Sequence, residues 1–209
     1  LSARAHAQSV LDAPITVNFS ARNTDFHFDQ RVAAHTVLAR TQWLLGFPEQ
    51  AVWHAREAAE RALAIGHMLS FIYALATGCA PVAFWVGDWQ EARRYTQLLE
   101  RRAEEYSLFF WQAFGAEYRL LLERREGSAA TLDPLVDPFT RMHLRDTLCS
   151  IDGGLADDSM LERGESGAAA WCAPEFLRIK GERLAGRGAV EAAEALYRKG
   201  LALAGEHQA

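Results

Sequence analysis

The sequence contains few cysteines, and their arrangement excludes several kinds of site. The three thiols, Cys79, Cys149 and Cys172, are odd in number, widely spaced and each set in an apolar stretch. No pair has the short separation of zinc ligands, and a disulfide framework is not expected in a chain of 209 residues. We therefore predict three buried free thiols and a reducing, cytoplasmic compartment.

The sequence also lacks a concentrated positive charge. It has 22 Lys and Arg residues against 27 Asp and Glu residues, a net charge of -5. The basic pairs Arg101-Arg102 and Arg124-Arg125 lie beside glutamates, which is typical of a solvated helix face. Direct contact of this chain with a nucleic-acid backbone is therefore not expected.

Long uninterrupted apolar runs and a leader are missing as well. The most apolar stretch, residues 68–86, contains Ser70, Thr77, Gly78 and Pro81, so it predicts a buried helix rather than a membrane span. The first residues do not have the charged and then apolar layout of a signal peptide. Because a helical pattern is already under way after Leu1, we expect the chain to be a fragment of a longer protein.

Catalytic and cofactor motifs are absent from the sequence. It has no phosphate-binding Gly-x-x-x-x-Gly-Lys-Ser/Thr run. The pairs Cys149–His143 and Ser150–Asp152 lie on no recognisable nucleophile turn. Seven histidines (His6, His27, His35, His54, His67, His143 and His207) form no His-x-x-x-His pair, and we expect them to lie apart. We predict no catalytic residue, no enzymatic activity, no cofactor and no metal.

What the sequence does have is a recurring turn. LGFPEQA at residues 45–51 and VGDWQEA at residues 86–92 share a plan, and their glycines, Gly46 and Gly87, are 41 residues apart. Gly127 follows 40 residues later, and RGAVEAA at residues 187–193 supplies a further copy around Gly188. A fixed period of this length is typical of a helical solenoid.

Each turn can be explained by its residues. Glycine ends the first helix in a left-handed conformation, Pro48 fits the first turn of the next helix, and Asp88 can cap another. The small Ala51, Ala92 and Ala193 allow close helix approach. The pattern predicts helices near residues 2–11, 30–45, 49–65, 69–86, 89–106, 108–125, 129–137, 139–150, 157–166, 171–186 and 190–206.

These elements predict an all-α fold. The expected architecture is a right-handed superhelical array of antiparallel helix pairs, a tetratricopeptide-like α-solenoid. We assign residues 1–29 to an N-terminal helix and an extended connector, and residues 30–209 to a repeat domain of about four to five helix pairs. Residues 150–170 are rich in Gly and Asp and predict an irregular stretch.

Longer strings suggest a family. They are DQRVAA at residues 29–34, LARTQWLLGFPEQA at 38–51, CAPVAFWVGD at 79–88, WCAPEFLRIKGE at 171–182 and AEALYRKGL at 193–201. Together they resemble the C-terminal helical region of large bacterial transcriptional regulators that carry an N-terminal winged helix and a central signal-transduction ATPase module. The resemblance implies a sensor arm that receives an inducer or a partner protein, with ATP binding outside this chain.

A binding groove follows from the repeat register. If the first helices of the pairs line a concave face, the residues that project towards it are Arg40, Trp43, Phe84, Trp85, Glu117, Arg124 and Arg178. Aromatic anchors with separated charges suit a protein, a peptide or a small-molecule inducer. For Trp43, Phe84 and Trp85 the competing interpretation is ordinary core packing, which we favour for any one of them. Residues 109–111 (FFW) predict either a seam between repeats or an exposed face for a homodimer.

Two functions from different classes of protein therefore stay open. The first is a non-catalytic sensor domain of a multidomain transcriptional regulator, which also contacts the rest of its parent protein. The alternative is a free-standing tetratricopeptide scaffold or adaptor that binds a peptide or protein. An α-helical enzyme ranks third, because it requires a closed pocket with converging titratable groups.

Overall fold

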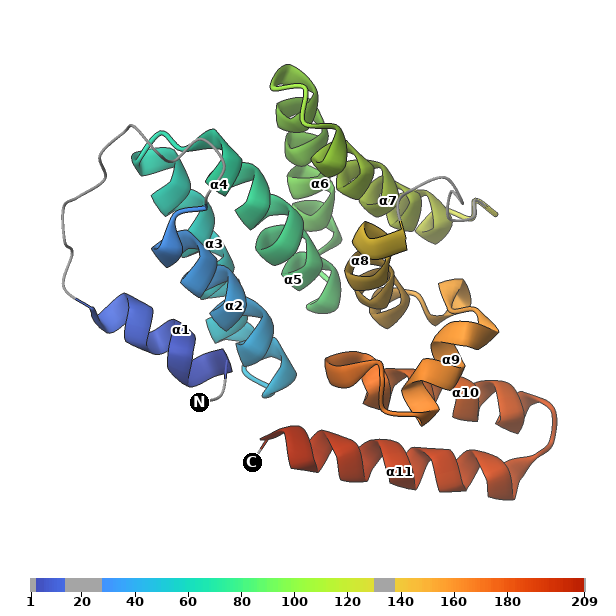
Figure 1. The fold of residues 1–209 in the computed structure, drawn as a ribbon. Helices are drawn as coiled ribbons and strands as arrows, with labels where there is room; N and C mark the ends of the chain where they lie inside the picture. Colours follow the sequence, from blue (N-terminus) through green and yellow to red (C-terminus); the bar gives the residue numbers. More distant parts are fainter. Residues whose placement is uncertain (1–2, 14–27, 130–137, 209) are drawn as a thin grey trace. The chain divides into compact units, whose positions relative to one another are not determined.

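The structure is a computed structural model that describes residues 3–13, 28–129 and 138–208. Within these ranges the chain forms helices and turns and contains no β-strand (Figure 1), so the all-α prediction is confirmed. The chain divides into two compact units, Leu1–Ser128 and Ala129–Ala209. This division lies inside the predicted repeat domain of residues 30–209, and the predicted domain assignment stays a prediction.

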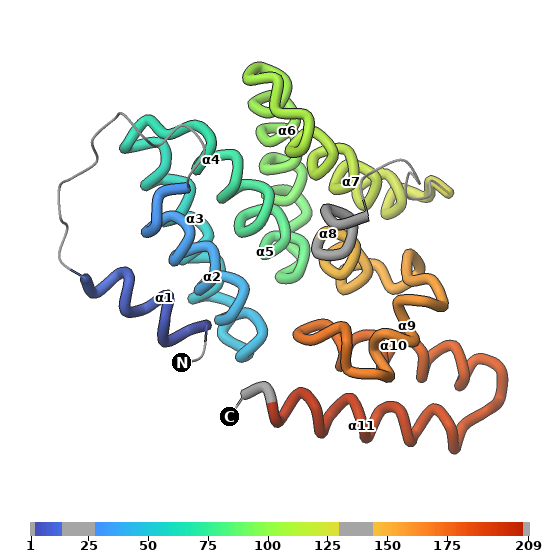
Figure 2. Tube along the Cα trace, viewed as in Figure 1, coloured from blue at the N-terminus to red at the C-terminus, as the bar shows by residue number. Residues whose placement is uncertain are grey.

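From α2 onwards, the helices of the first unit follow one another through short turns, as the tube in Figure 2 shows. The helices of this unit are α1 (Ala3–Asp12), α2 (Gln30–Leu44), α3 (Pro48–Ala64), α4 (Met68–Ala74), η1 (Leu75–Cys79), α5 (Ala80–Trp85), α6 (Trp89–Glu105) and α7 (Phe109–Arg125). Each packs on its sequence neighbour, and α2 also contacts α4, η1 and α5, while α7 contacts η1. Helices α2, α4–η1–α5 and α7 therefore form one layer, with α3 and α6 packed beside it.

The predicted turns are present. Gly46 and Gly87 have φ values of 84° and 75°, which only glycine adopts without steric penalty, and each separates two packed helices. Pro48 is in the first turn of α3, and the Asp88 carboxylate accepts the Glu91 N–H at 3.0 Å to cap α6. The glycine and capping predictions are confirmed.

Small residues allow the helices of this unit to pack closely. On α3 the buried alanines are Ala51, Ala55, Ala58, Ala59 and Ala62, a stripe with the period of a helix. Ala51 and Ala92 have no exposed surface, as the sequence predicts. Helix α1 joins the same packing because Ala7 is buried against Ala34 and Leu38 of α2.

Helix α4–η1–α5 is continuous from Met68 to Trp85, but its middle turn is a π-helix, which the sequence analysis did not predict. Pro81 explains the irregularity, since it has no N–H to donate to the carbonyl of Thr77, four residues earlier. The Ala80 N–H donates to Leu75 rather than to Ala76. Two carbonyls, those of Ala76 and Thr77, thus lose their α-helical donors.

Side chains from the two neighbouring helices occupy these carbonyls. The Tyr118 hydroxyl of α7 donates to the Ala76 oxygen at 2.7 Å, and Arg40 of α2 donates from Nη1 to the Thr77 oxygen at 3.2 Å. A buried carbonyl without a donor is costly, so these two bonds stabilise the irregular turn. The π-helix consequently ties three helices of one layer together.

A buried network fixes the beginning of that layer. Asp29 caps α2 by accepting the Val32 N–H at 2.9 Å, and its carboxylate also accepts Arg61 Nε of α3 at 2.9 Å. Its own N–H donates to Ser70 Oγ of α4 at 2.8 Å. Burial opposes ionisation of Asp29, but the bonds from Arg61 and Val32 outweigh it and hold the pKa of Asp29 below its usual value.

The apolar stretch predicted as a buried helix lies in the middle of this unit. Met68–Trp85 is the described helix that is long and apolar enough, by length and composition, to cross a membrane. However, 72% of it is buried by the rest of the fold. A core helix passes the same test of length and composition, so this burial supports the predicted core helix.

The second unit contains shorter and less regular elements. They are α8 (Pro138–Ile151), η2 (Gly153–Leu155), α9 (Asp158–Glu165), η3 (Ala170–Cys172), α10 (Ala173–Gly186) and α11 (Val190–Gln208). Its core gathers Met160, Phe176 and Ile179 around Cys149 and Cys172. Gly188 has a φ of 83° between α10 and α11, and Ala193 is buried, both as predicted.

Two predicted features of this part of the chain have different outcomes. The irregular stretch at residues 150–170 is confirmed, since it holds two short 3₁₀ turns around the eight-residue α9. All but the first residue of the predicted helix at residues 129–137, and residues 14–27 of the predicted connector, lie outside the described residues.

Candidate binding surface

The centre of the candidate surface is a pair of stacked indoles in the first unit. Trp43 lies in the last turn of α2 and Trp85 is the last residue of α5. Their ring centroids are 4.3 Å apart at an interplanar angle of 15°, and both side chains are half-buried. Each ring therefore keeps part of its apolar surface available to a ligand.

A guanidinium group completes this pair. Arg40 lies one turn before Trp43 on α2, and its guanidinium carbon is 5.0 Å from the centroid of the Trp85 ring. The hydrogen bond from Arg40 to the Thr77 carbonyl also holds the Arg40 side chain in place. Cation–π contact and hydrogen bonding thus hold a positive charge beside two aromatic rings. We refer to Arg40, Trp43 and Trp85 as the Trp–Arg cluster.

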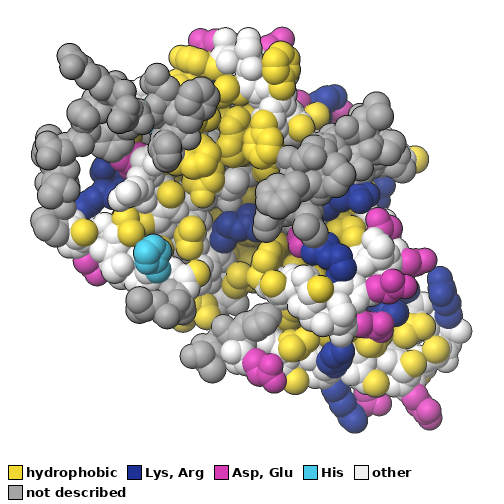
Figure 3. Space-filling model, in the orientation of Figure 1, with side chains coloured by type: hydrophobic (Ala, Val, Ile, Leu, Met, Phe, Trp, Pro, Cys, Tyr) yellow, Lys and Arg dark blue, Asp and Glu magenta, His cyan; other side chains and the backbone are white. Residues whose placement is uncertain are grey.

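An aromatic row lies in the same helical layer. Phe28 stacks on Tyr73 of α4 with centroids 4.2 Å apart, and Trp111 of α7 meets both rings edge-on at 6.0 and 6.1 Å. The Arg40 charge also acts on Tyr73 and Tyr118. Figure 3 shows hydrophobic side chains gathered over α4 and towards α6 and α7 on the face that it displays. The Trp–Arg cluster and the aromatic row both belong to the layer of α2, α4–η1–α5 and α7.

Three further residues predicted for the groove, Phe84, Glu117 and Arg124, also belong to the first unit. Phe84 is buried, with only 3% of its surface exposed, and packs against Trp89 and Tyr118 at 5.6 and 5.7 Å. It is therefore a core residue, as the competing interpretation predicts. Glu117 is buried on α7, and Arg124 is half-buried in the last turn of the same helix.

Arg178 belongs to the second unit. It is exposed on α10 and pairs with two glutamates of its own helix, Glu175 and Glu182. These are i,i+3 and i,i+4 contacts of a solvated helix face, which contribute little stability individually. The structure thus gives Arg178 a local role on α10.

The aromatic string at residues 109–111 divides between core and surface. Trp111 is 8% exposed, whereas Phe109 and Phe110 are 78% and 50% exposed at the start of α7. Trp111 is therefore a packing residue, whereas Phe109 and Phe110 form an exposed apolar face. No described contact shows whether a second copy of this chain or another partner binds to that face.

Sequence reasoning missed the hydrogen bonds at the π-helical turn beside the cluster. Thr77 and Tyr118 act through a backbone carbonyl and a hydroxyl, and neither stands out in a single sequence. The available signal was Pro81 inside a helical pattern, because it predicts free carbonyls that some donor must occupy.

The expectation that the histidines lie apart is wrong for one pair. His35 of α2 and His54 of α3 face each other with their Nδ1 atoms 3.0 Å apart, and the Trp53 ring packs on both. Burial, followed by the charges of His54, Arg61 and Arg31, lowers the pKa of His35 to about 4. The pair cannot be recognised from sequence spacing, because His35 and His54 lie on two different helices. Among the described residues no group of three or more His, Cys, Asp or Glu side chains could hold a metal ion.

The cysteines are buried free thiols, as predicted. Cys79 donates to the Ala55 carbonyl at 3.1 Å, and Cys172 donates to the Asp146 carbonyl at 3.4 Å. Burial raises the pKa of both Cys79 and Cys149 to about 12, so these groups stay protonated at neutral pH. Neither has the thiolate character that a nucleophile needs.

Comparison with protein-family models finds none that matches the chain, and comparison with curated proteins and with solved structures finds no significant match either. The resemblance to winged-helix ATPase regulators therefore stays a prediction.

Proposed function

We propose that the first unit binds a protein or peptide through the Trp–Arg cluster, as part of a tetratricopeptide-like sensor region in a larger bacterial regulator. The observation that carries this proposal is the stacked and half-buried Trp43–Trp85 pair with Arg40 beside it. Tryptophan and arginine are the side chains that most often dominate binding energy at protein interfaces. The alternative of a free-standing adaptor uses the same surface.

The packing of the first unit supports a repeat array. Helix hairpins with glycine turns recur with nearly the same period, and three successive first helices lie in one layer. In such an array each pair contacts mainly its neighbours, so the exposed side of the first-helix layer forms a continuous surface. A partner laid along it would reach the Trp–Arg cluster and the aromatic row together.

A non-catalytic role is part of the proposal. Among the described residues, the titratable groups with altered pKa values are buried thiols and phenols, salt-bridged side chains, capping carboxylates or the His35–His54 pair. Structural contacts account for each of them, and within the described part of the chain no nucleophile, base and orienting group converge. A binding role therefore explains the Trp–Arg cluster better than a catalytic role does.

Peptide selection tests the proposal without knowledge of the natural partner. Random linear peptides displayed on phage are selected against the intact chain, and the tightest synthetic peptide is titrated calorimetrically. We expect Trp85→Ala to weaken its binding by about 2 kcal/mol, roughly 30-fold, because a central aromatic anchor is lost. Arg40→Gln, which keeps the size of the side chain but removes its charge, should weaken binding in the same direction.

Trp53→Ala is the matched control, since Trp53 is 53% exposed in the same unit but packs on the His35–His54 pair outside the cluster. It should leave the affinity unchanged. Circular dichroism confirms that each variant is folded. Failure to select any peptide, or equal affinities for all three variants, would contradict the proposal.

A further inference from the structure

A pair of histidines joins the two helices of the first hairpin. Helices α2 and α3 are connected through the turn at Gly46 and pack against each other. His35 of α2 and His54 of α3 approach until their Nδ1 atoms are 3.0 Å apart. The His54 side chain is buried and that of His35 is half-buried. Because the two nitrogen atoms are at hydrogen-bond distance, one proton must lie between them.

The protonation state of the pair decides whether this bond exists. A neutral imidazole carries its proton on one ring nitrogen and accepts at the other. When both rings are neutral, one Nδ1–H therefore donates to the other Nδ1, and the two rings are opposite tautomers. A first added proton can enter at the Nε2 atom of the donating ring and leaves the bond intact. A second added proton gives both Nδ1 atoms a hydrogen and both rings a charge, so the rings must separate.

The charges around the pair oppose protonation. Arg31 of α2 and Arg61 of α3 are the cations that act on His35. Asp29 binds Arg61 at 2.9 Å, and α2 itself contains no acidic side chain. The half-buried Glu57 of α3 is not among the charges that act on either histidine. Within the described part of the chain, no carboxylate therefore offsets a positive charge on the pair.

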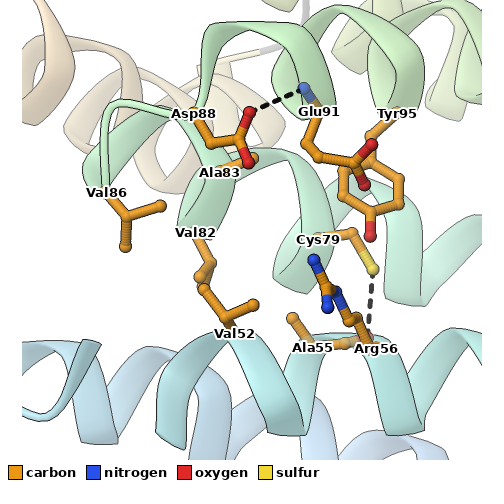
Figure 4. A pocket seen from close by; sticks show the side chains of 10 residues that line it. All are labelled: Val52, Ala55, Arg56, Cys79, Val82, Ala83, Val86, Asp88, Glu91 and Tyr95. Atoms are coloured by element: carbon orange, nitrogen blue, oxygen red, sulfur yellow. Dashed lines mark hydrogen bonds between the residues drawn. The ribbon is translucent and has the colours of Figure 1, made fainter. Parts of the chain in front are cut away.

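The other helices that pack on α2 and α3 bring no charge to the pair. Helices α4, η1 and α5 contain no Asp, Glu, Lys, Arg or His side chain, and α1 packs on α2 through apolar side chains while its charged residues are exposed. Figure 4 shows the next contact along α3, where the Cys79 thiol donates to the Ala55 carbonyl. Burial raises the pKa of this thiol to about 12, so it does not titrate in acid. Arg56, Asp88 and Glu91, also shown there, are not among the charges that act on either histidine.

We propose that the His35–His54 pair is an acid-sensitive contact, which holds α2 to α3 at neutral pH and releases them from each other when both rings are protonated. In the unfolded chain each histidine takes up its proton near pH 6.5. In the folded chain burial lowers the pKa of both, and that of His35 to about 4. The stability that the pair contributes is therefore complete above about pH 6.5 and is lost as the pH falls towards 4.

The contact has a consequence for the candidate binding surface. Helix α2 also carries Arg40 and Trp43, so acidification loosens the hairpin that positions two members of the Trp–Arg cluster. This consequence rests on the proposed function. The acid-sensitive contact itself is measured without any peptide, so its failure is distinguishable from failure of the proposed function.

The first test follows the two histidines directly. The intact chain, labelled with nitrogen-15 in histidine, is titrated by nuclear magnetic resonance from neutral to acidic pH. We expect opposite tautomers at neutral pH, one ring with Nδ1–H and the other with Nε2–H. We also expect the pair to take up its last proton at least about one pH unit below the ordinary value for histidine. Identical tautomers, or two histidines that both titrate at the ordinary value, would overturn the proposal.

The second test is the pH dependence of unfolding in urea. The double variant His35→Gln/His54→Gln keeps polar side chains that cannot be protonated. Between about pH 7 and pH 5, the unfolding equilibrium constant of the parent should rise at least about tenfold more than that of the double variant. His6→Gln is the matched control, because His6 is exposed on α1 and its loss should keep the pH dependence of the parent.

Equal pH dependence of the parent and the double variant would also overturn the proposal. If the double variant does not fold, the tautomers and the titration of the parent decide the question alone.

Discussion

At the scale of single residues, Pro81 determines much of the geometry of the first unit. A proline in the interior of a helix removes one donor and clashes with the preceding turn, and the chain responds with the π-helical turn at residues 75–79. The carbonyls of Ala76 and Thr77 then attract Tyr118 and Arg40. Arg40 is therefore positioned beside Trp85 by a backbone irregularity.

Removal of the Tyr118 hydroxyl tests this explanation. Tyr118 is 1% exposed, so Tyr118→Phe leaves the Ala76 carbonyl buried without its donor. We expect the free energy of unfolding to fall by about 1–2 kcal/mol, measured by urea titration. Tyr106→Phe is the control, because Tyr106 is 48% exposed and its change should leave stability within error. Equal stability of all three proteins would show that the bond to Ala76 contributes nothing.

At the scale of elements, the sequence predicts most helix bounds to within one or two residues. The prediction works because glycine turns, Pro48 and Asp88 are strong local signals. It fails within Met68–Trp85, where apolar periodicity cannot reveal a π-turn. It also missed a second set of turns between the pairs: Gly66 and Ser107 are 41 residues apart and both have positive φ, at 67° and 53°.

Ser107 adopts a conformation that disfavours any side chain, which leads to a prediction. Ser107→Gly should raise the free energy of unfolding by about 0.5–1 kcal/mol, because relief of left-handed strain exceeds the entropy that glycine loses on folding. Ser166→Gly is the control, since Ser166 has a φ of -74° and no such strain. Thermal and urea unfolding measure both variants. A Ser107→Gly protein that is less stable than the parent would contradict the assigned turn.

At the scale of the whole molecule, the sequence predicts the class of fold and part of the site. Arg40, Trp43 and Trp85 do meet, because residues three apart on α2 share a face that packs near the end of α5. Phe84 could not join them, since adjacent residues on a helix point about 100° apart. Arg178 lies in the second compact unit, and a repeat register read from sequence does not reveal that division.

The central claim is that a partner binds across the layer of α2, α4–η1–α5 and α7, with the Trp–Arg cluster as its anchor. Hydrogen–deuterium exchange of the intact chain, with and without the selected peptide, tests it most directly. We predict slower exchange in residues 40–45 and 77–86, around the cluster, and unchanged exchange in residues 49–64 of α3. Protection confined to α3, or to the second unit, would contradict the claim.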